Sequence, residues 1–185
     1  MLKDSASGYG LITIVLHWLT AILVIFLFGL GLYMTSLDYY SPWYHKGPAL
    51  HVSLGLLLLA LMILRILWRS GNQNPSALAG IDRRTLLAAT AVKVVLYVLI
   101  FTLCISGYLI TTAEGQAANF FDLLGVPATL QLSAANVDLI GEVHEYCAWS
   151  LVIIASLHGV AALFHHFVKK DRTLLRMLKP VKKFN

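Results

Sequence analysis

The sequence predicts an all-α fold, a transmembrane four-helix bundle that forms a single membrane domain over residues 1–185. Of these residues, 58% are hydrophobic and 12% are charged, whereas a typical globular protein carries roughly 25% charged residues. Four apolar stretches each approach the roughly 20 residues that a helix needs to cross a hydrocarbon core about 30 Å thick. The stretches are continuous and lack the alternation of a membrane β-barrel, which favours helices.

The four helices are expected at residues 11–34, 48–68, 91–113 and 140–168, followed by a cytoplasmic tail at 169–185. The first stretch carries no formal charge, and it is longer than the roughly 7–15 apolar residues of a secretion signal. It is therefore interpreted as a spanning helix. The second stretch ends where Arg65 appears, and the third begins after Lys93. The fourth contains histidines but no acidic or basic residue from 146 to 168.

The positions of Lys and Arg predict that both termini are cytoplasmic. With the N-terminus inside, segments 1–10, 65–93 and 169–185 are cytoplasmic, and they hold 13 of the 14 basic residues. Basic residues collect in cytoplasmic loops because they resist translocation. The predicted outer loops carry Lys46 and six acidic residues, namely Asp38, Glu114, Asp122, Asp138, Glu142 and Glu145. The formal charge of +5 therefore reflects topology and contact with anionic lipid, and it gives no reason to expect nucleic acid.

Histidines in the predicted spans are the candidate functional residues, because an ionisable side chain is costly inside a membrane. His144 and His158 are 14 residues apart, so they share one helix face and differ in depth by about 21 Å. Ala148, Ala155 and Ala162 follow the same stripe. Small residues there leave room for a large flat group, whereas bulky leucines would favour plain helix packing.

Each of these two histidines has a predicted partner at its own depth. His51 and His144 both lie within about 5 Å of the outer surface by helical rise, and His17 and His158 lie about 25 Å below it. Two facing imidazoles are the axial ligands of a low-spin haem, and helix bundles commonly hold such cofactors. The sequence thus predicts two haems, with iron bound by His51 and His144 and by His17 and His158. Structural zinc would need four clustered ligands, and the alternative for each histidine is a hydrogen bond between helices.

Three further residues are candidate binding residues near the inner pair. Arg65 follows His51 by 14 residues, so its guanidinium could hold a haem propionate; the alternative is an arginine that snorkels to the interface. His165 and His166 are candidates for a quinone pocket, since an imidazole can hydrogen-bond a quinone carbonyl and relay a proton. Their alternative is an interfacial position beside the basic tail. His45 is expected in an outer loop.

Several motifs resemble the bacterial cytochrome b561 family over essentially the whole chain. They are Ile-Val-Leu-His-Trp-Leu at 14–19, His-Val-Ser-Leu-Gly at 51–55, Leu-Arg-Ile-Leu-Trp at 64–68, Val-His-Glu at 143–145, His-Gly-Val-Ala-Ala-Leu-Phe-His-His at 158–166 and Lys-Asp-Arg-Thr-Leu-Leu-Arg-Met at 170–177. The resemblance implies two b haems ligated by the residues that match His17, His51, His144 and His158. It also implies a bacterial inner membrane location and ubiquinone as an electron partner. Close relatives of this kind are described as superoxide oxidases.

The expected function is electron transfer across the membrane to or from ubiquinone, with superoxide as a candidate donor. A superoxide anion would be steered best by a positive surface, and the acidic outer loops do not supply one, so the donor stays open. One alternative is a haem-b membrane-anchor subunit of a larger dehydrogenase or hydrogenase complex, although the chain has no long docking extension. A second is a small histidine-dependent transporter, which would be expected to use acidic relays inside the membrane. The sequence assigns no catalytic residue, and it leaves homodimers and partner subunits open.

Overall fold

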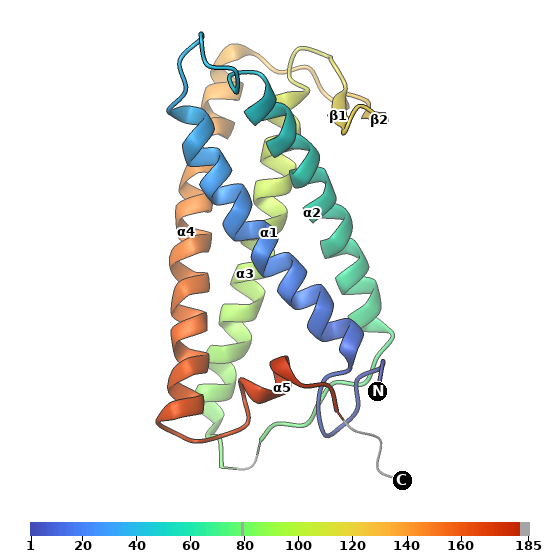
Figure 1. Cartoon of the computed structure of the whole chain (residues 1–185), viewed down its shortest axis with the longest axis vertical. Coiled ribbons are helices and arrows are strands. Elements are labelled where there is room, and N and C mark those ends of the chain that lie inside the picture. Colours follow the sequence, from blue (N-terminus) through green and yellow to red (C-terminus); the bar gives the residue numbers. More distant parts are fainter. Residues whose placement is uncertain (79, 182–185) are drawn as a thin grey trace. The chain divides into compact units, whose positions relative to one another are not determined.

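The computed structural model describes residues 1–78 and 80–181 (Figure 1). Four long helices account for most of these residues: α1 (Leu11–Thr35), α2 (Lys46–Ser70), α3 (Arg83–Thr111) and α4 (Ala134–Phe167). A short helix, α5 (Leu175–Leu178), and two strands, β1 (Ala118–Phe120) and β2 (Leu124–Val126), complete the described elements. Each of the four long helices is long and apolar enough to cross a membrane. The predicted all-α membrane fold is therefore confirmed.

Two of the helices begin more than one turn earlier than the hydropathy pattern predicts. α3 begins at Arg83 rather than at residue 91, and α4 begins at Ala134 rather than at residue 140. Both extra segments contain charged residues, Arg83 and Arg84 in the first and Asp138 in the second. Asp82 stabilises the first because Oδ1 accepts hydrogen bonds from the backbone N–H groups of Arg84 and Thr85 at 2.9 and 3.1 Å. Hydropathy marks only the part of a helix that lies in hydrocarbon, whereas backbone hydrogen bonding continues into water.

The chain packs as two compact units, and every long helix contributes to both. The first, here called the terminal unit, comprises Met1–Ala21, Leu61–Tyr97 and Ile153–Asn185. The second, here called the hairpin unit, comprises Ile22–Ala60 and Val98–Val152. The basic residues divide unequally, since 13 of the 14 fall in the terminal unit and Lys46 alone falls in the hairpin unit. A single membrane domain over the whole chain stays a prediction.

In the terminal unit, a buried carboxylate joins the segment before α1 to the end of α2. Asp4 is 7% exposed. It accepts hydrogen bonds from the backbone N–H of Gly10 at 2.7 Å and from the Thr13 hydroxyl at 2.9 Å, and Arg69 lies 3.4 Å from the same carboxylate. The Trp68 indole N–H donates to the Thr13 hydroxyl at 3.0 Å. This network satisfies the buried charge and holds the two helix ends together.

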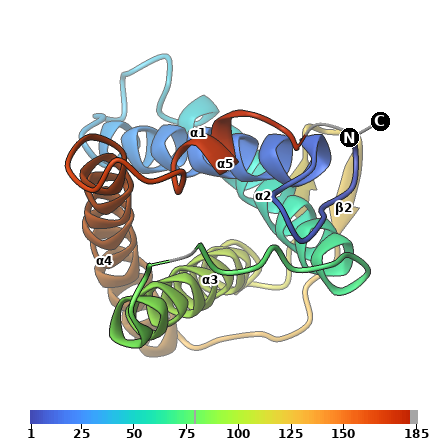
Figure 2. The same cartoon turned by 90° about the horizontal axis from the view of Figure 1, so that it is seen from below.

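The C-terminal segment of the terminal unit lies across the beginning of α1, as Figure 2 shows for α5. The Trp18 indole N–H donates to the carbonyl of Met177 at 2.7 Å, and the Arg176 guanidinium donates to the carbonyl of Ser76 at 2.8 Å. The backbone N–H of Val181 donates to the carbonyl of Tyr9 at 3.0 Å. The predicted tail is thus held against the unit up to Val181, and its last four residues lie outside the described residues.

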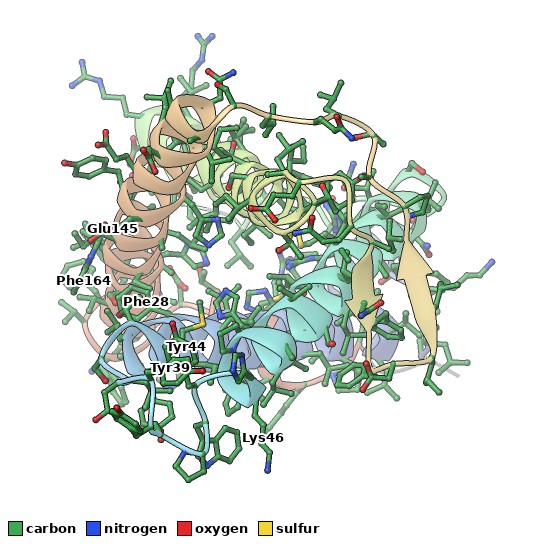
Figure 3. All side chains as sticks on the ribbon, turned by 90° about the horizontal axis from the view of Figure 1, so that it is seen from above. Phe28, Tyr39, Tyr44, Lys46, Glu145 and Phe164 are labelled. Atoms are coloured by element: carbon green, nitrogen blue, oxygen red, sulfur yellow. The ribbon has the colours of Figure 1, made fainter. Side chains whose placement is uncertain are left out.

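In the hairpin unit, strands β1 and β2 pair antiparallel in the connection between α3 and α4. The Ser53 hydroxyl of α2 accepts a hydrogen bond from the backbone N–H of Phe121 at 3.0 Å, which anchors the turn of the hairpin. The connection between α1 and α2 carries an aromatic cluster, in which the rings of Tyr39 and Tyr44 lie 5.4 Å apart (Figure 3). Exposed tyrosines and tryptophans of this kind are typical of the membrane–water interface.

Candidate functional site

The hairpin unit brings two of the predicted ligands together. His51 comes from the second turn of α2 and His144 from the third turn of α4. Their ring centres lie 6.3 Å apart, with an angle of 63° between the ring planes. Two imidazoles that bind one metal from opposite sides, each through a bond of about 2 Å, place their ring centres roughly 6 Å apart. The separation therefore fits a pair of axial ligands.

Each of these imidazoles packs against a glycine of the preceding helix. A Cβ on Gly31 of α1 would lie 3.4 Å from Cε1 of His51, and a Cβ on Gly107 of α3 would lie 3.2 Å from Cε1 of His144. The rings occupy these places because the two helix backbones carry no side chain there. Sequence reasoning missed both glycines, although a glycine inside an apolar stretch was a signal that could have found them.

The Nδ1 atoms of His51 and His144 have different surroundings. Nδ1 of His144 lies 2.9 Å from the hydroxyl of Ser106 on α3, and Ser106 is 5% exposed. Nδ1 of His51 is buried, and no hydrogen-bond partner for it exists among the described residues. Sequence reasoning missed Ser106 as well. A serine in an apolar span was the only signal for it, because its contact with His144 depends on how α3 faces α4.

The other predicted pair, His17 and His158, belongs to the terminal unit. Nη2 of Arg65 on α2 lies 3.1 Å from Nδ1 of His17, and the guanidinium lies 5.3 Å from the centre of the Tyr97 ring. Nε of Arg65 is buried and has no partner among the described residues. His158 of α4 belongs to the same unit. The structure therefore places Arg65 at the side of a candidate ligand, where it has a free donor.

The two histidines at the end of α4 have separate environments. His165 pairs through Nδ1 with the carboxylate of Asp171, whereas Nδ1 of His166 is buried without a described partner. A pocket of about 310 Å³ adjoins His165 and Asp171, with Thr85 and Phe164 also in its lining. His166 does not line this pocket. The structure thus gives a polar cavity to one of the two predicted quinone residues.

The carboxylate of Asp171 is held in its charged form. Burial raises its pKa, but the hydrogen bonds from His165 and from the backbone N–H of Thr173 outweigh this effect and hold the pKa below its usual value. The backbone N–H of Thr173 donates to Oδ1 at 2.8 Å. An ionised carboxylate beside an imidazole can stabilise that imidazole when it carries a proton.

Taken together, the described residues fit haem better than a clustered metal ion. Within residues 1–78 and 80–181, no three His, Cys, Asp or Glu side chains lie close enough together to hold a metal. The described residues instead offer one pair of neighbouring imidazoles, His51 and His144, two glycines that make room for these rings, and buried nitrogens without partners. His45, which the sequence places in an outer loop, is exposed and packs on Tyr44.

Comparison with known proteins identifies the family of the chain. A family model described as prokaryotic cytochrome b561 matches residues 8–180. The chain is 47% identical over 175 residues to "Cytochrome b561 homolog 2" of Escherichia coli (strain K12), which covers 95% of this chain and 93% of that protein. It is 31% identical over 171 residues to "Probable superoxide oxidase CybB" of Yersinia pestis, with 92% and 95% covered. The chain therefore belongs to the prokaryotic cytochrome b561 family, the membrane b-type cytochromes that bind haem b and transfer electrons.

Proposed function

We propose that this cytochrome holds two b haems and passes electrons between them across the membrane, to or from ubiquinone. His51 and His144 are the proposed ligands of one haem, and His17 and His158 are those of the other. The observation that carries the proposal is the facing pair in the hairpin unit, whose ring centres lie 6.3 Å apart. His158 follows His144 by 14 residues on the same helix, and this spacing supports a second pair that includes His158.

A bound haem supplies one-electron transfer, because its iron alternates between the ferric and ferrous states. The residues of this chain hold and orient it. The four histidines would bind the two haem irons through ring nitrogens, while Gly31 and Gly107 leave room for two of the rings. Arg65 has a buried Nε without a partner, so it is the proposed partner of a haem propionate through charge-assisted hydrogen bonds.

The pocket beside His165 is the proposed quinone site. The imidazole of His165 can donate a hydrogen bond to a quinone carbonyl, and Asp171 can stabilise the protonated ring during proton transfer. Thr85 and Phe164 supply a polar and an apolar wall. His166 is a second candidate for binding the quinone, and in that role its buried Nδ1 would have to face the quinone ring. A quinone-dependent reoxidation rate that falls in His165→Ala but not in His166→Ala would assign the role to His165.

Both termini are proposed to face the cytoplasm of a bacterial inner membrane, since the terminal unit holds nearly all the basic residues. The hairpin unit would then meet the electron donor on the outer side. It holds Lys46 and six acidic residues, all of them exposed. In Figure 3 the labelled side chains of Lys46 and Glu145 both extend away from their helices.

The named activity of the Yersinia pestis relative makes superoxide one proposed donor, in a superoxide:ubiquinone oxidoreductase. The acidic charge of the hairpin unit favours a second candidate, because it repels an anion and attracts a basic protein surface. In that case the chain serves as the haem-b membrane anchor of a larger complex. Superoxide generated beside the purified, oxidised protein separates the two, since only the first candidate predicts rapid haem reduction and quinone turnover. The second candidate is supported if added protein does not change the rate at which superoxide reduces quinone, and if a stoichiometric subunit is retained on purification.

The experiment that tests the central proposal is a measurement of haem per chain. Protein purified in detergent from cells supplied with haem would be assayed by the pyridine haemochrome and by its dithionite-reduced spectrum. Two b haems per chain are expected. One haem would leave only one of the histidine pairs as ligands, and a folded protein without haem would overturn the proposal and favour the transporter alternative.

A further inference from the structure

We propose that Ser106 is a positioning residue for His144: its hydroxyl fixes the tautomer of the imidazole and thereby sets the reduction potential of one haem and not of the other. The inference rests on the proposed role of His144 as an axial ligand. It goes beyond that role because it assigns a function to a residue that would not touch iron.

The hydrogen bonds around Ser106 determine which ring nitrogen carries the proton. The Ser106 hydroxyl lies 3.2 Å from the backbone carbonyl of Leu103 and 2.9 Å from Nδ1 of His144. A carbonyl oxygen can only accept, so in the hydrogen bond to Leu103 the serine proton points to that carbonyl and a lone pair of the serine oxygen faces His144. In the arrangement that we propose, Nδ1 of His144 is therefore the donor. The proton of the neutral ring is thereby held on Nδ1, and Nε2 keeps the lone pair that a metal needs.

The opposite histidine has the same packing but lacks this hydrogen bond. Gly31 lies against His51 as Gly107 lies against His144. The residue before Gly107 is Ser106, whereas the residue before Gly31 is Leu30, a buried leucine that offers no acceptor. Nδ1 of His51 accordingly has no partner among the described residues. Of the two facing histidines, only His144 is oriented by a hydroxyl.

A hydrogen bond of this kind changes the ligand as well as its orientation. When a ligating imidazole donates its other N–H to an acceptor, its basicity rises. A more basic ligand stabilises ferric iron relative to ferrous iron, so the reduction potential falls. Removing the hydroxyl should therefore make the haem bound by His144 easier to reduce. The haem of the other pair should be unaffected, since Ser106 belongs to the hairpin unit and contacts neither His17 nor His158.

The test compares Ser106→Ala with Ser106→Thr by redox titration and by low-spin ferric electron paramagnetic resonance. Ser106→Ala is expected to shift the oxidation equilibrium of one haem several-fold towards the reduced form and to move its largest g value. Ser106→Thr keeps the hydroxyl and should behave as the unaltered protein, because an apolar groove of about 300 Å³ beside Ser106 can take the added methyl group. Ser53→Ala is the matched control. It removes a buried hydroxyl of the same unit that anchors the hairpin and touches no histidine.

Haem content separates the failure of this inference from the failure of the proposed function. If the unaltered protein holds two haems and Ser106→Ala leaves both potentials and both ferric signals unchanged, the role proposed for Ser106 is wrong. The proposed ligand assignment is then unaffected. A shift of equal size in Ser53→Ala also overturns it, since the effect would then be general. If His144→Ala keeps two haems, the ligand assignment itself is wrong. Should Ser106→Ala lose haem, Ser106→Cys decides, because a weak sulfur acceptor predicts a smaller shift in the same direction and no shift contradicts the inference.

Discussion

Gly107 and His144 pack so closely that a Cβ on the glycine would lie 3.2 Å from Cε1 of the imidazole. The same relation holds between Gly31 and His51, at 3.4 Å. The backbones of α1 and α3 thus pack directly against the imidazoles of His51 and His144. This packing limits the directions in which the two rings can move.

Replacing Gly107 with leucine should displace His144 and reduce the haem content from two per chain to one. The side chain would fill the space that the imidazole now occupies, since a Cβ alone already requires the ring to give by a few tenths of an ångström. Gly29→Leu is the matched control on α1, because Gly29 is exposed and a Cβ there meets nothing within 4 Å. The pyridine haemochrome measures both variants. Two haems in Gly107→Leu would contradict the assigned packing.

Single replacements of the candidate ligands should each remove one haem. His51→Ala removes an axial nitrogen from one pair, and His17→Ala removes one from the other, so each variant is expected to hold one haem with a different reduction potential. His45→Ala should retain both haems, since His45 is exposed in the connection between α1 and α2. Loss of both haems in either variant, with the protein still folded, would show that the two sites are not independent.

Arg65→Leu should lower the reduction potential of the haem bound by His17 and His158, and it should reduce the occupancy of that site. A nearby cation favours the reduced state because reduction adds an electron, and the guanidinium lies 3.1 Å from His17. Arg69→Leu is the control from the same helix. Its guanidinium pairs with Asp4, so this change should affect stability more than potential. Equal potentials in Arg65→Leu and the unaltered protein would remove Arg65 from the site.

The contact between Asp171 and the end of α4 should be lost in acid. Hydrogen bonds from Thr173 and His165 hold the pKa of Asp171 below its usual value despite some burial. A carboxylate whose pKa is lowered by folding contributes stability above its unfolded pKa of about 3.9, and this contribution is lost as the pH falls through the lower folded value. The protection factor for hydrogen exchange in segment 171–178, which corrects the exchange rate for its intrinsic pH dependence, should therefore be high near neutral pH and fall below about pH 4. In Asp171→Asn this segment should lack the acid-dependent change in hydrogen exchange. If the change persists in that variant, a titrating group other than Asp171 causes it.

Reporter fusions should place both termini on the cytoplasmic side. An alkaline phosphatase fused in the connection between α1 and α2, or in that between α3 and α4, is expected to be active because the enzyme needs the oxidising outer compartment. A fusion at the C-terminus is expected to be inactive, while a fluorescent protein fused there should fluoresce. The reverse pattern would overturn the predicted topology and move the proposed quinone pocket to the outer side.

The fold class and the family were predictable because both depend on local patterns. Apolar stretches of spanning length predicted four helices, and all four exist. The starts of α3 and α4 were predicted too late, because charged residues such as Arg83 and Asp138 interrupt the apolar pattern in the first turns of these helices. The helical period also placed His51 and His144 at one depth, and the structure brings their rings to 6.3 Å.

The sequence by itself determined the spanning helices, the separation of basic from acidic segments and the repeat that puts His144 and His158 on one face. These properties follow from hydropathy, charge and a fixed rotation of about 100° per residue, none of which requires a second helix. Only the tertiary structure decided that Gly107 supports His144, that Ser106 bonds its Nδ1, and that Arg65 turns to His17. The physical reason is that each of these contacts joins two helices. Which faces meet, and at what depth, is set by how complementary side chains pack, and no single segment of sequence contains that information.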